Sequence, residues 1–347
     1  MPARADGLAI GVNVVDPYKL TVAEQDAMLG RIAAAGIHTI RASLTFDDHG
    51  IAFAERATAA GLNIDWLIFR FGGYSPGGPA LSSADPETFR RTFAPILAKL
   101  EADGITLAAF ELGNEFNLGG YNADLPRAPQ GMVYGASDLA SPKLQSVARG
   151  YLQYLKVLAT LKDIRDRSKL NAHTPVLSGG LAVYESADGA LPSGTSAHVV
   201  SVAATLGFLR AHGLDALVDA YAIHVYPRGN APGDPVAADD RKTKLAAYAL
   251  GACRRSGSAT GKPCWLTEWG FNDADAHCPI DDSARSELTR EMMGDFRPYV
   301  RDGRLVGLLA YAWNDVPGTT PVSPLTPFRC GALSAGGKLS VDANLLK

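Results

Sequence analysis

The sequence has no apolar run of the roughly 18 residues that a membrane-spanning helix needs, and it has no cluster of basic residues. Its 33 Lys and Arg residues nearly balance its 36 Asp and Glu residues, so the formal net charge is −3. A chain this close to neutral lacks the basic surface on which nucleic-acid binding depends. We therefore expect neither a membrane span nor a nucleic-acid partner.

Motifs of several common enzyme classes are also missing. The sequence has no P-loop, no G-x-S-x-G segment around a serine nucleophile and no glycine-rich loop after its first apolar segment. These absences disfavour nucleotide hydrolases, α/β-hydrolases and dinucleotide-binding folds. Hydrophobic residues make up 47% of the 347 positions and charged residues 20%, which is typical of a folded globular chain.

Short apolar segments alternate with helical patterns along the chain. Several of the apolar segments are almost continuously hydrophobic, as expected for strands covered on both faces. Helix signals lie between them: a capping box from Thr21 to Glu24, Asp85 before Pro86, and Ser141 before a proline. Gly61, Gly213 and Gly303 occupy positions where helices end. The expected strands are residues 8–15, 38–44, 64–71, 107–113, 175–179, 218–226, 264–269 and 306–313.

Eight strand–helix alternations predict an α/β fold with a parallel sheet and helical crossovers. A single closed (β/α)₈ TIM barrel fits this count, whereas a doubly wound open sheet is the alternative. We expect one domain over residues 1–347, with the barrel core at about 8–315 and a short C-terminal extension at 316–347. A long loop, residues 118–140, follows strand four. It is either a solvent-exposed insertion or a wall of a substrate cleft, because barrels build their sites at this end of the strands.

The chain has only four cysteines, and all of them lie after residue 250. No two of them form the C-x-x-C pair of common zinc sites; a metal site and four free thiols are the alternatives to disulfides. A short loop separates Cys253 from Cys264, while Cys278 and Cys330 follow neighbouring strands of the expected barrel. We therefore predict the disulfides Cys253–Cys264 and Cys278–Cys330.

An even number of cysteines favours an oxidising compartment. The first residues carry no apolar segment of the kind found in signal peptides. Either the protein is cytosolic, or its signal peptide is not part of this sequence. The cysteines favour the second alternative, so we expect a secreted or periplasmic protein.

Two of the expected strands have a glutamate at their C-terminal end. Glu115 lies at the end of the fourth, in Phe110-Glu-Leu-Gly-Asn-Glu-Phe-Asn117, and Glu268 at the end of the seventh, in Trp265-Leu-Thr-Glu-Trp-Gly-Phe271. Either one alone could be a salt-bridge partner. Two carboxylates at one barrel mouth raise each other's cost of ionising, so one tends to keep a proton. An acid beside a base or nucleophile is what glycosidic bond cleavage requires.

These segments resemble the clan-A glycoside hydrolases, and families 39 and 5 in particular. The resemblance covers about residues 8–315. Its individual motifs are short, but their order and their placement on the strands agree with the clan. Phe116 departs from it, since many relatives have proline there, and so does Gly113, where several have a bulky residue. The matching positions are Arg41, Asn114, Glu115, Ser178-Gly-Gly-Leu181, His224, Tyr226, Glu268 and Trp313.

The resemblance implies a retaining glycoside hydrolase that cleaves a polysaccharide or oligosaccharide by double displacement. Glu115 would be the general acid/base and Glu268 the nucleophile. Arg41 and Tyr226 would flank Glu268 and keep it ionised. Arg41 could instead pair with a structural acid, and Tyr226 could be barrel packing.

The same resemblance implies substrate contacts. Asn114 would bind the sugar hydroxyl next to the reacting carbon, and His224 would support Glu115 or contact the sugar. Trp313 would be the platform under the sugar ring. A core position for His224 or Trp313, and a backbone-capping role for Asn114, are the alternatives. Strict alternation puts Asn114 and Glu115 on opposite faces, so strand four must bulge or end there if both face a cleft.

We expect a monomer that acts on glycans and needs neither a cofactor nor a metal ion. A barrel that only binds glycans would be expected to lack one of the carboxylates, and a metal-dependent barrel hydrolase would need more strand-end ligands than His224. Six aromatic residues lie near strand ends, enough to line several sugar subsites, and this number favours endo action. Two of them, Tyr121 and Trp269, are predicted substrate contacts. The aromatic residues near strand ends are Trp66, Phe71, Tyr74, Tyr121, Tyr134 and Trp269.

Overall fold

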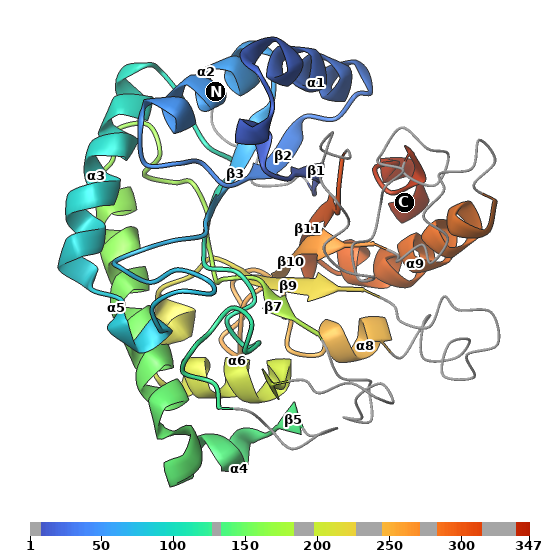
Figure 1. Cartoon of the computed structure of the whole chain (residues 1–347). Helices are drawn as coiled ribbons and strands as arrows, with labels where there is room; N and C mark the ends of the chain where they lie inside the picture. Colours follow the sequence, from blue (N-terminus) through green and yellow to red (C-terminus); the bar gives the residue numbers. More distant parts are fainter. Residues whose placement is uncertain (1–7, 127–132, 184–197, 227–244, 271–282, 314–337) are drawn as a thin grey trace. The chain divides into compact units, whose positions relative to one another are not determined.

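The computed structural model describes residues 8–126, 133–183, 198–226, 245–270, 283–313 and 338–347 (Figure 1). The chain forms two compact units. The first comprises Met1–Ser43, Ala52–Asp65 and His224–Lys347, and the second comprises Leu44–Ile51 and Trp66–Ile223. Each unit contains parallel strands connected by helices.

The first unit holds the two ends of the chain. Its described strands are β1 (Ala9–Val14), β2 (Thr39–Ala42), β10 (Cys264–Trp269) and β11 (Leu305–Ala310). They lie in the order β2-β1-β11-β10, and all of these pairings are parallel. The helices of this unit are η1 (Pro17–Lys19), α1 (Val22–Ala34), α8 (Leu245–Ala249), α9 (Ser283–Arg301) and η6 (Ala343–Leu346).

The second unit contains the middle of the chain. Strand β4 (Ala109–Leu112) pairs in parallel with β6 (Val176–Leu177), and β5 (Val133–Tyr134) pairs in parallel with β8 (Val199–Val200). Strand β7 (Leu181–Ala182) also lies wholly within this unit. The helices are η2 (Leu81–Ser83), α3 (Pro86–Ala102), α4 (Ala136–Leu139), η3 (Pro142–Leu144), α5 (Gln145–Asp166), α6 (Val202–Ala211) and η4 (Leu214–Ala216).

Three elements contain residues of both units: α2 (Asp48–Ala59), β3 (Asn63–Ile68) and β9 (Tyr221–Val225). All eight predicted strands are therefore present, as β1, β2, β3, β4, β6, β9, β10 and β11. The short strands β5, β7 and β8 were not predicted. Each has only two residues and lies outside the eight segments predicted as strands.

The predicted helix starts are confirmed at the atomic level. Thr21 Oγ1 accepts the N–H of Glu24, and the Glu24 carboxylate accepts the N–H of Thr21 over 2.8 Å, which completes the capping box of α1. Asp85 caps α3 by accepting the N–H of Thr88 over 2.7 Å. Pro142 starts a 3₁₀ turn that leads into α5.

The core of the second unit is rich in aromatic side chains. Trp66 lies 4.9 Å from Phe93 of α3 between ring centroids, and Phe93 lies 5.9 Å from Phe110 of β4. This packing changes the prediction that strand-end aromatic residues line sugar subsites. Five of the six have exposed fractions of 2% or less: Trp66, Phe71, Tyr74 and Tyr134 in the second unit, and Trp269 in the first. Only Tyr121 is partly exposed.

The described part of the predicted 118–140 loop is attached to its neighbours within the second unit. The Asp124 carboxylate accepts the N–H and the hydroxyl of Ser82 over 2.7 and 2.6 Å. The Tyr74 hydroxyl donates to the carbonyl of Tyr121 over 2.6 Å. Ordered contacts of this kind hold the start of the loop against η2.

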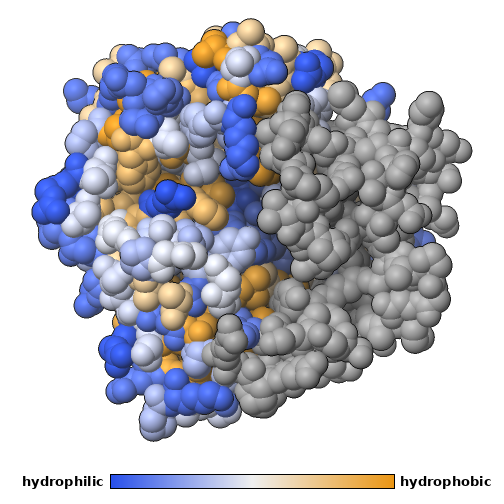
Figure 2. All heavy atoms as spheres, viewed as in Figure 1, coloured by the Kyte–Doolittle hydropathy of each residue, from blue (hydrophilic) through white to orange (hydrophobic). Residues whose placement is uncertain are grey.

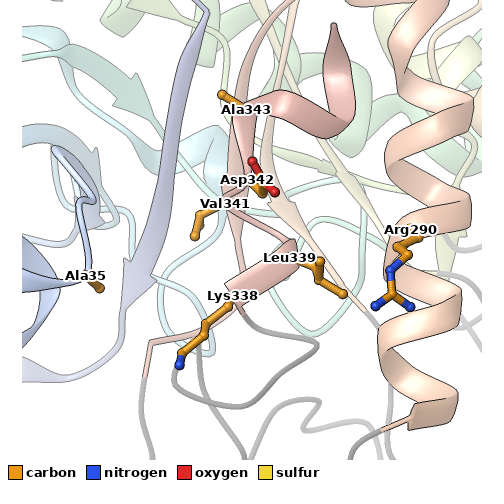
Figure 3. A pocket seen from close by; sticks show the side chains of 7 residues that line it. All are labelled: Ala35, Arg290, Lys338, Leu339, Val341, Asp342 and Ala343. Atoms are coloured by element: carbon orange, nitrogen blue, oxygen red, sulfur yellow. The ribbon is translucent and has the colours of Figure 1, made fainter.

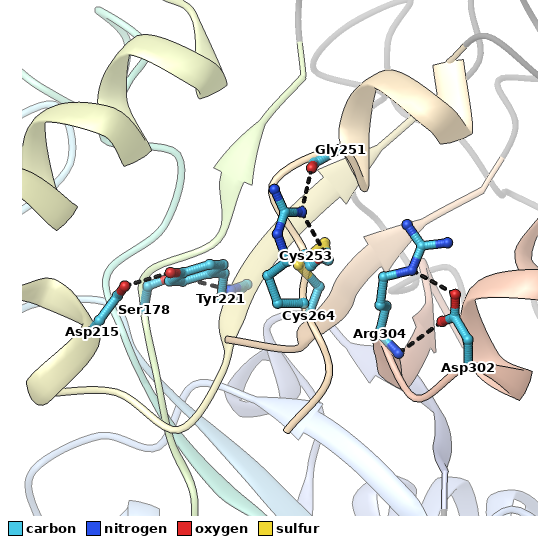
Figure 4. Close-up of a disulfide and its surroundings, with 10 residues drawn as sticks. Ser178, Asp215, Tyr221, Gly251, Cys253, Cys264, Asp302 and Arg304 are labelled. Carbon is cyan, nitrogen blue, oxygen red and sulfur yellow. Dashed lines mark hydrogen bonds and ion pairs between the residues drawn. A yellow bond between two sulfur atoms is a disulfide. The ribbon is translucent and has the colours of Figure 1, made fainter. Parts of the chain in front are cut away.

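A disulfide joins Cys253, which follows α8, to Cys264, the first residue of β10 (Figure 4). The Cα atoms are 5.5 Å apart and both residues are fully buried. This pair is the predicted one. Cys278 and Cys330 lie outside the described residues.

The last residues of the C-terminal extension are held by α9. Arg297 donates from Nε and Nη2 to the carbonyl of Leu345, over 3.0 and 2.8 Å.

Hydrophilic and hydrophobic residues are intermixed on the face shown in Figure 2. The large hydrophobic residues that the structure shows as exposed are Val22, Leu152 and Leu170. Among the described helices, none has the length and apolar character that crossing a membrane demands.

Candidate active site

Glu268 lies near the end of β10, at an irregular point of the strand. Leu266 pairs with Leu308 of β11, and Trp269 pairs with Ala310, so β10 has an extra residue between these two pairs. Such a bulge redirects side chains that regular alternation would send to opposite faces. It places Thr267 and Glu268 next to the same imidazole: Thr267 Oγ1 lies 3.2 Å from His224 Nε2, and Glu268 Oε2 lies 3.6 Å from His224 Nδ1.

Two further side chains bind the Glu268 carboxylate directly. Arg41 of β2 donates from Nη1 to Oε1 over 2.6 Å, and Tyr226, just after β9, donates its hydroxyl hydrogen to Oε2 over 2.6 Å. Glu268 and Arg41 are only 8% and 2% exposed. Burial by itself raises the pKa of Glu268. The electrostatic effects of His224 and Arg41 and the hydrogen bonds from Tyr226 and Arg41 outweigh burial and hold that pKa below its ordinary value. The site therefore keeps this carboxylate ionised.

Asn13 is a member of this cluster that we did not identify from the sequence. It stands opposite Arg41 in the β1–β2 register, and its Oδ1 accepts a hydrogen bond from Arg41 Nη1 over 2.9 Å. Its Nδ2 lies 2.9 Å from the carbonyl of Thr267 and 3.3 Å from those of Leu309 and Ala310. A single amide thus connects the ends of β1, β2, β10 and β11. Nothing in the sequence near Asn13 indicates which distant groups its amide binds, so the sequence alone did not reveal this role.

Trp313 and Trp269 belong to the same unit but differ in their surroundings. The N–H of Trp313 donates to the carbonyl of Asn13 over 2.9 Å, so its backbone is tied to the Glu268 cluster, and its side chain is enclosed at 1% exposed. The ring of Trp269 packs edge-on against Phe296 of α9, with centroids 5.3 Å apart. Trp269 is therefore a core residue packed against α9, and we leave it out of the proposed site.

Glu115 belongs to the second unit and follows the end of β4. The strand stops at Leu112, and Gly113 and Glu115 both have positive φ, at 91° and 45°. The left-handed region is uncommon for a residue other than glycine, and such strain concentrates at functional sites. The strand thus ends before Asn114, as required if Asn114 and Glu115 are to face one cleft.

Backbone contacts hold this turn against the segment after β6. Asn114 forms a parallel bridge with Gly180, and the N–H of Glu115 donates to the carbonyl of Gly180 over 2.7 Å. Asn114 is buried at 5% exposed, while Glu115 is partly exposed. Tyr121, further along the loop, contacts Phe69 with ring centroids 6.3 Å apart. The carboxyl group of Glu115 and the ring of Tyr121 thus both come from the segment after β4.

A separate cavity of about 540 Å³ lies elsewhere in the first unit (Figure 3). Ala35 is at the end of α1, before β2 begins, so this cavity lies toward the N-terminal ends of the strands and Glu268 lies at the other end. The lining residues are Ala35, Arg290, Lys338, Leu339, Val341, Asp342 and Ala343. It is not part of the site described above.

The whole chain can be compared with known proteins. No protein-family model and no curated protein matches the sequence. Among solved structures, the chain is similar to a family 39 glycoside hydrolase from the gut symbiont Bacteroides cellulosilyticus WH2, with a TM-score of 0.56 and 19% identity over 98% of this chain and 64% of that one. The chain therefore spans less than two thirds of the length of that enzyme.

Two further neighbours have similar scores. Fungal β-1,4-galactanases match with a TM-score of 0.60 and 15% identity, over 96% of this chain and 99% of theirs. A GH5_18 enzyme from Streptomyces cattleya, a glutamate-to-alanine variant in complex with Manβ1-4GlcNAc, matches with 0.58 and 15%, over 96% and 79%. The neighbours include clan-A hydrolases of families 39 and 5, which confirms the predicted resemblance and the TIM-barrel fold.

Proposed function

We propose that this protein is a retaining glycoside hydrolase. One observation carries the proposal: Glu268 is a buried carboxylate held ionised by Arg41 and Tyr226 at the end of β10. Burial favours the neutral acid, so a carboxylate in a desolvated site stays charged only when several donors surround it, and a nucleophilic carboxylate must be charged to attack. The fold shared with families 39 and 5 supports the same assignment.

In the first step, an oxygen of Glu268 attacks the anomeric carbon of the bound sugar. The glycosidic C–O bond breaks, and Glu115 gives its proton to the departing oxygen. The result is a glycosyl ester on Glu268 and an ionised Glu115. Negative charge close to the anomeric carbon stabilises the oxocarbenium-like transition state on the way.

In the second step, Glu115 takes a proton from a water molecule whose oxygen attacks the same carbon. The ester bond to Glu268 breaks, and both glutamates return to their starting states. Two inversions leave the sugar with its original configuration. This chemistry requires carboxyl groups about 5–5.5 Å apart, against roughly 6.5–9.5 Å in inverting enzymes.

We extend the proposal to the substrate and the compartment. The substrate is a polysaccharide or oligosaccharide, bound through Asn114, His224 and Trp313 and cleaved internally. The disulfide at the start of β10 fits an oxidising compartment, so we propose that the protein is secreted or periplasmic. The size distribution of early products from a long glycan tests internal cleavage, because endo action gives oligosaccharides and exo action gives one small product.

A panel of glycans and aryl glycosides, followed by NMR of the first product, tests the reaction. We expect a product with the configuration of the substrate, and we expect Glu268→Gln to abolish turnover because no glycosyl ester forms. Glu115→Ala should be slow on poor leaving groups, and azide should partly restore it by giving a glycosyl azide of retained configuration. An inverted first product would overturn the mechanism even if both glutamates proved essential.

Two controls separate this proposal from its alternatives. If the barrel only binds glycans, Glu268→Gln will bind as well as the unmodified protein and neither will turn over substrate. If a metal ion does the chemistry, metal analysis of active protein will find it in stoichiometric amount and a chelator will remove activity. A retaining hydrolase of the proposed kind keeps its rate in the chelator.

A further inference from the structure

Glu111 is a fully buried carboxylate that the proposed mechanism does not use. It is the third residue of β4, four positions before Glu115, and its exposed fraction is 0%. Phe110, its neighbour in the strand, packs against Phe93 of α3. Alternation therefore directs the Glu111 side chain to the other face of the strand, away from α3. A carboxylate is stable at such a position only when it has hydrogen-bond partners.

Gly180 connects this buried carboxylate to Glu115. The N–H of Gly180 donates to Oε1 of Glu111 over 3.0 Å, and the carbonyl of Gly180 accepts the N–H of Glu115 over 2.7 Å. One residue thus joins the two glutamates through two consecutive hydrogen bonds. Because hydrogen bonds are directional, the position of Gly180 determines where the Glu115 peptide can lie.

The backbone of Glu115 is in a conformation that needs such support. Its φ of 45° is in the left-handed region, which residues other than glycine keep only when their surroundings hold them there. If Gly180 moved, this backbone could relax toward an ordinary conformation. The Cα–Cβ bond of Glu115 would then turn, and the carboxyl group would move away from its working position.

The peptide before Gly180 has a different anchor. The N–H of Gly179 donates to the hydroxyl of Tyr154 in α5 over 2.8 Å. A Cβ atom at Gly179 would lie 2.5 Å from the carbonyl oxygen of Leu112, so only glycine allows this close approach. Tyr154 thus accepts a hydrogen bond from the residue before Gly180 and not from Gly180 itself, which makes Tyr154 a suitable control for Glu111.

We propose that Glu111 is a positioning residue that sets the direction of the Glu115 carboxyl group through Gly180. This inference rests on the proposed function, because it assumes that Glu115 is the acid/base. Loss of the Glu111 acceptor should impair proton transfer to the leaving group. It should have little effect on attack by Glu268 when the leaving group needs no proton.

The experiment compares kcat/KM on two aryl glycosides of the same sugar. A phenyl glycoside needs protonation of its leaving group, whereas a 2,4-dinitrophenyl glycoside does not. Glu111→Met keeps a similar volume but has no oxygen acceptor. We expect it to lose about 10- to 100-fold on the phenyl glycoside, as small displacements of a catalytic group do, with little loss on the dinitrophenyl glycoside.

Three further variants decide the outcome. Glu111→Gln keeps an oxygen acceptor for Gly180 and should recover most of the lost activity. Tyr154→Phe removes a buried hydrogen bond one peptide away and should affect both substrates alike. If Glu111→Met does not fold, Glu111→Asp gives the same comparison, because it withdraws the carboxylate by one methylene. Equal losses on both substrates in the Glu111 variants would overturn the inference.

Glu115→Ala, measured alongside, distinguishes failure of the inference from failure of the proposed function. If Glu115→Ala shows no preference for the dinitrophenyl glycoside, Glu115 is not the acid/base, and both are wrong. If Glu115→Ala shows that preference and the Glu111 variants do not, only the role of Glu111 is wrong.

Discussion

The hydroxyl of Tyr226 and the guanidinium of Arg41 bind different oxygens of the Glu268 carboxylate, Tyr226 at Oε2 and Arg41 at Oε1, each over 2.6 Å. Burial alone would favour the protonated acid at this position. The two donors, together with His224, reverse that tendency and hold the pKa of Glu268 below its ordinary value. A carboxylate that is both buried and ionised is well prepared to attack an electrophilic carbon.

Tyr226→Phe should shift the acid limb of the pH–activity profile. Without the hydroxyl, the pKa of Glu268 rises, so as the pH falls Glu268 is protonated earlier and activity is lost at a higher pH than in the unmodified protein. A hydrogen bond to a charged group contributes about 1.5–3 kcal/mol, so kcat/KM on the acid side should fall about tenfold or more. The measurement is kcat/KM as a function of pH.

Tyr221→Phe is the matched control for that shift. Tyr221 is the first residue of β9, and like Tyr226 it donates its hydroxyl hydrogen to a carboxylate, that of Asp215. Its loss should reduce stability without moving the acid limb. If Tyr226→Phe leaves the limb in place, or if Tyr221→Phe moves it equally, the Tyr226 hydroxyl does not control the ionisation of Glu268.

Asn13→Ala should destabilise the group of side chains around Glu268, although Asn13 is not a partner of the Glu268 carboxylate in the contacts described above. It removes the acceptor that holds Arg41 and the donor that contacts three carbonyl groups. Leaving buried polar groups unsatisfied costs about 1–3 kcal/mol each, so the free energy of unfolding should fall by about that amount or more. The acid limb should also move to higher pH, because Arg41 loses its fixed position beside Glu268.

Denaturant unfolding and the pH profile together check this prediction. Asn63→Ala is the control: Asn63 is exposed at the start of β3, and its side-chain amide donates to the carbonyl of His38 over 3.4 Å. Its substitution should change neither quantity much. A loss of stability in Asn13→Ala with an unmoved acid limb would show that Asn13 supports the fold and not the ionisation of Glu268.

Much of the fold could be predicted from local patterns, because strand and helix signals are short-range. The capping box at Thr21 and the cap at Asp85 depend on residues three positions apart, and both are present as predicted. The placement of Glu268 and Tyr226 at strand ends also followed from alternation and from the family resemblance. Aromatic residues near strand ends, such as Trp66, were predicted to line sugar subsites but lie in the core. Their burial depends on neighbours that are distant in the sequence.

The parts that could not be predicted depend on contacts between distant residues. The bulge beside Glu268 is visible only as a register difference between β10 and β11. Asn13 and Arg41 are 28 positions apart, and Glu111 reaches Gly180 across 69 positions. A single sequence contains no signal for such pairs, since asparagine and glutamate occur in strands for many reasons.

The cysteines give a test that needs no substrate. Intact-mass measurement after alkylation without reductant should find no labelled thiol, because Cys253 pairs with Cys264 and we predict that Cys278 pairs with Cys330. Two labelled thiols, mapped to Cys278 and Cys330, would refute the second pair alone, and four would also refute the expectation of an oxidising compartment. Closing the 11-residue separation should contribute about 3 kcal/mol to stability on the chain-entropy model.

Trp313→Phe should weaken substrate binding more than it weakens the fold. We expect the smaller ring to keep most of the packing at this enclosed position but to offer the sugar less apolar surface, whereas Trp313→Ala should cost about 3–5 kcal/mol of stability. Titration of substrate onto Glu268→Gln, with and without Trp313→Phe, measures binding without turnover. Trp269→Phe is the control, since it is equally buried but packs against Phe296 of α9. It should lower stability and leave affinity unchanged; full affinity in Trp313→Phe, or equal losses in both, would place Trp313 in the core.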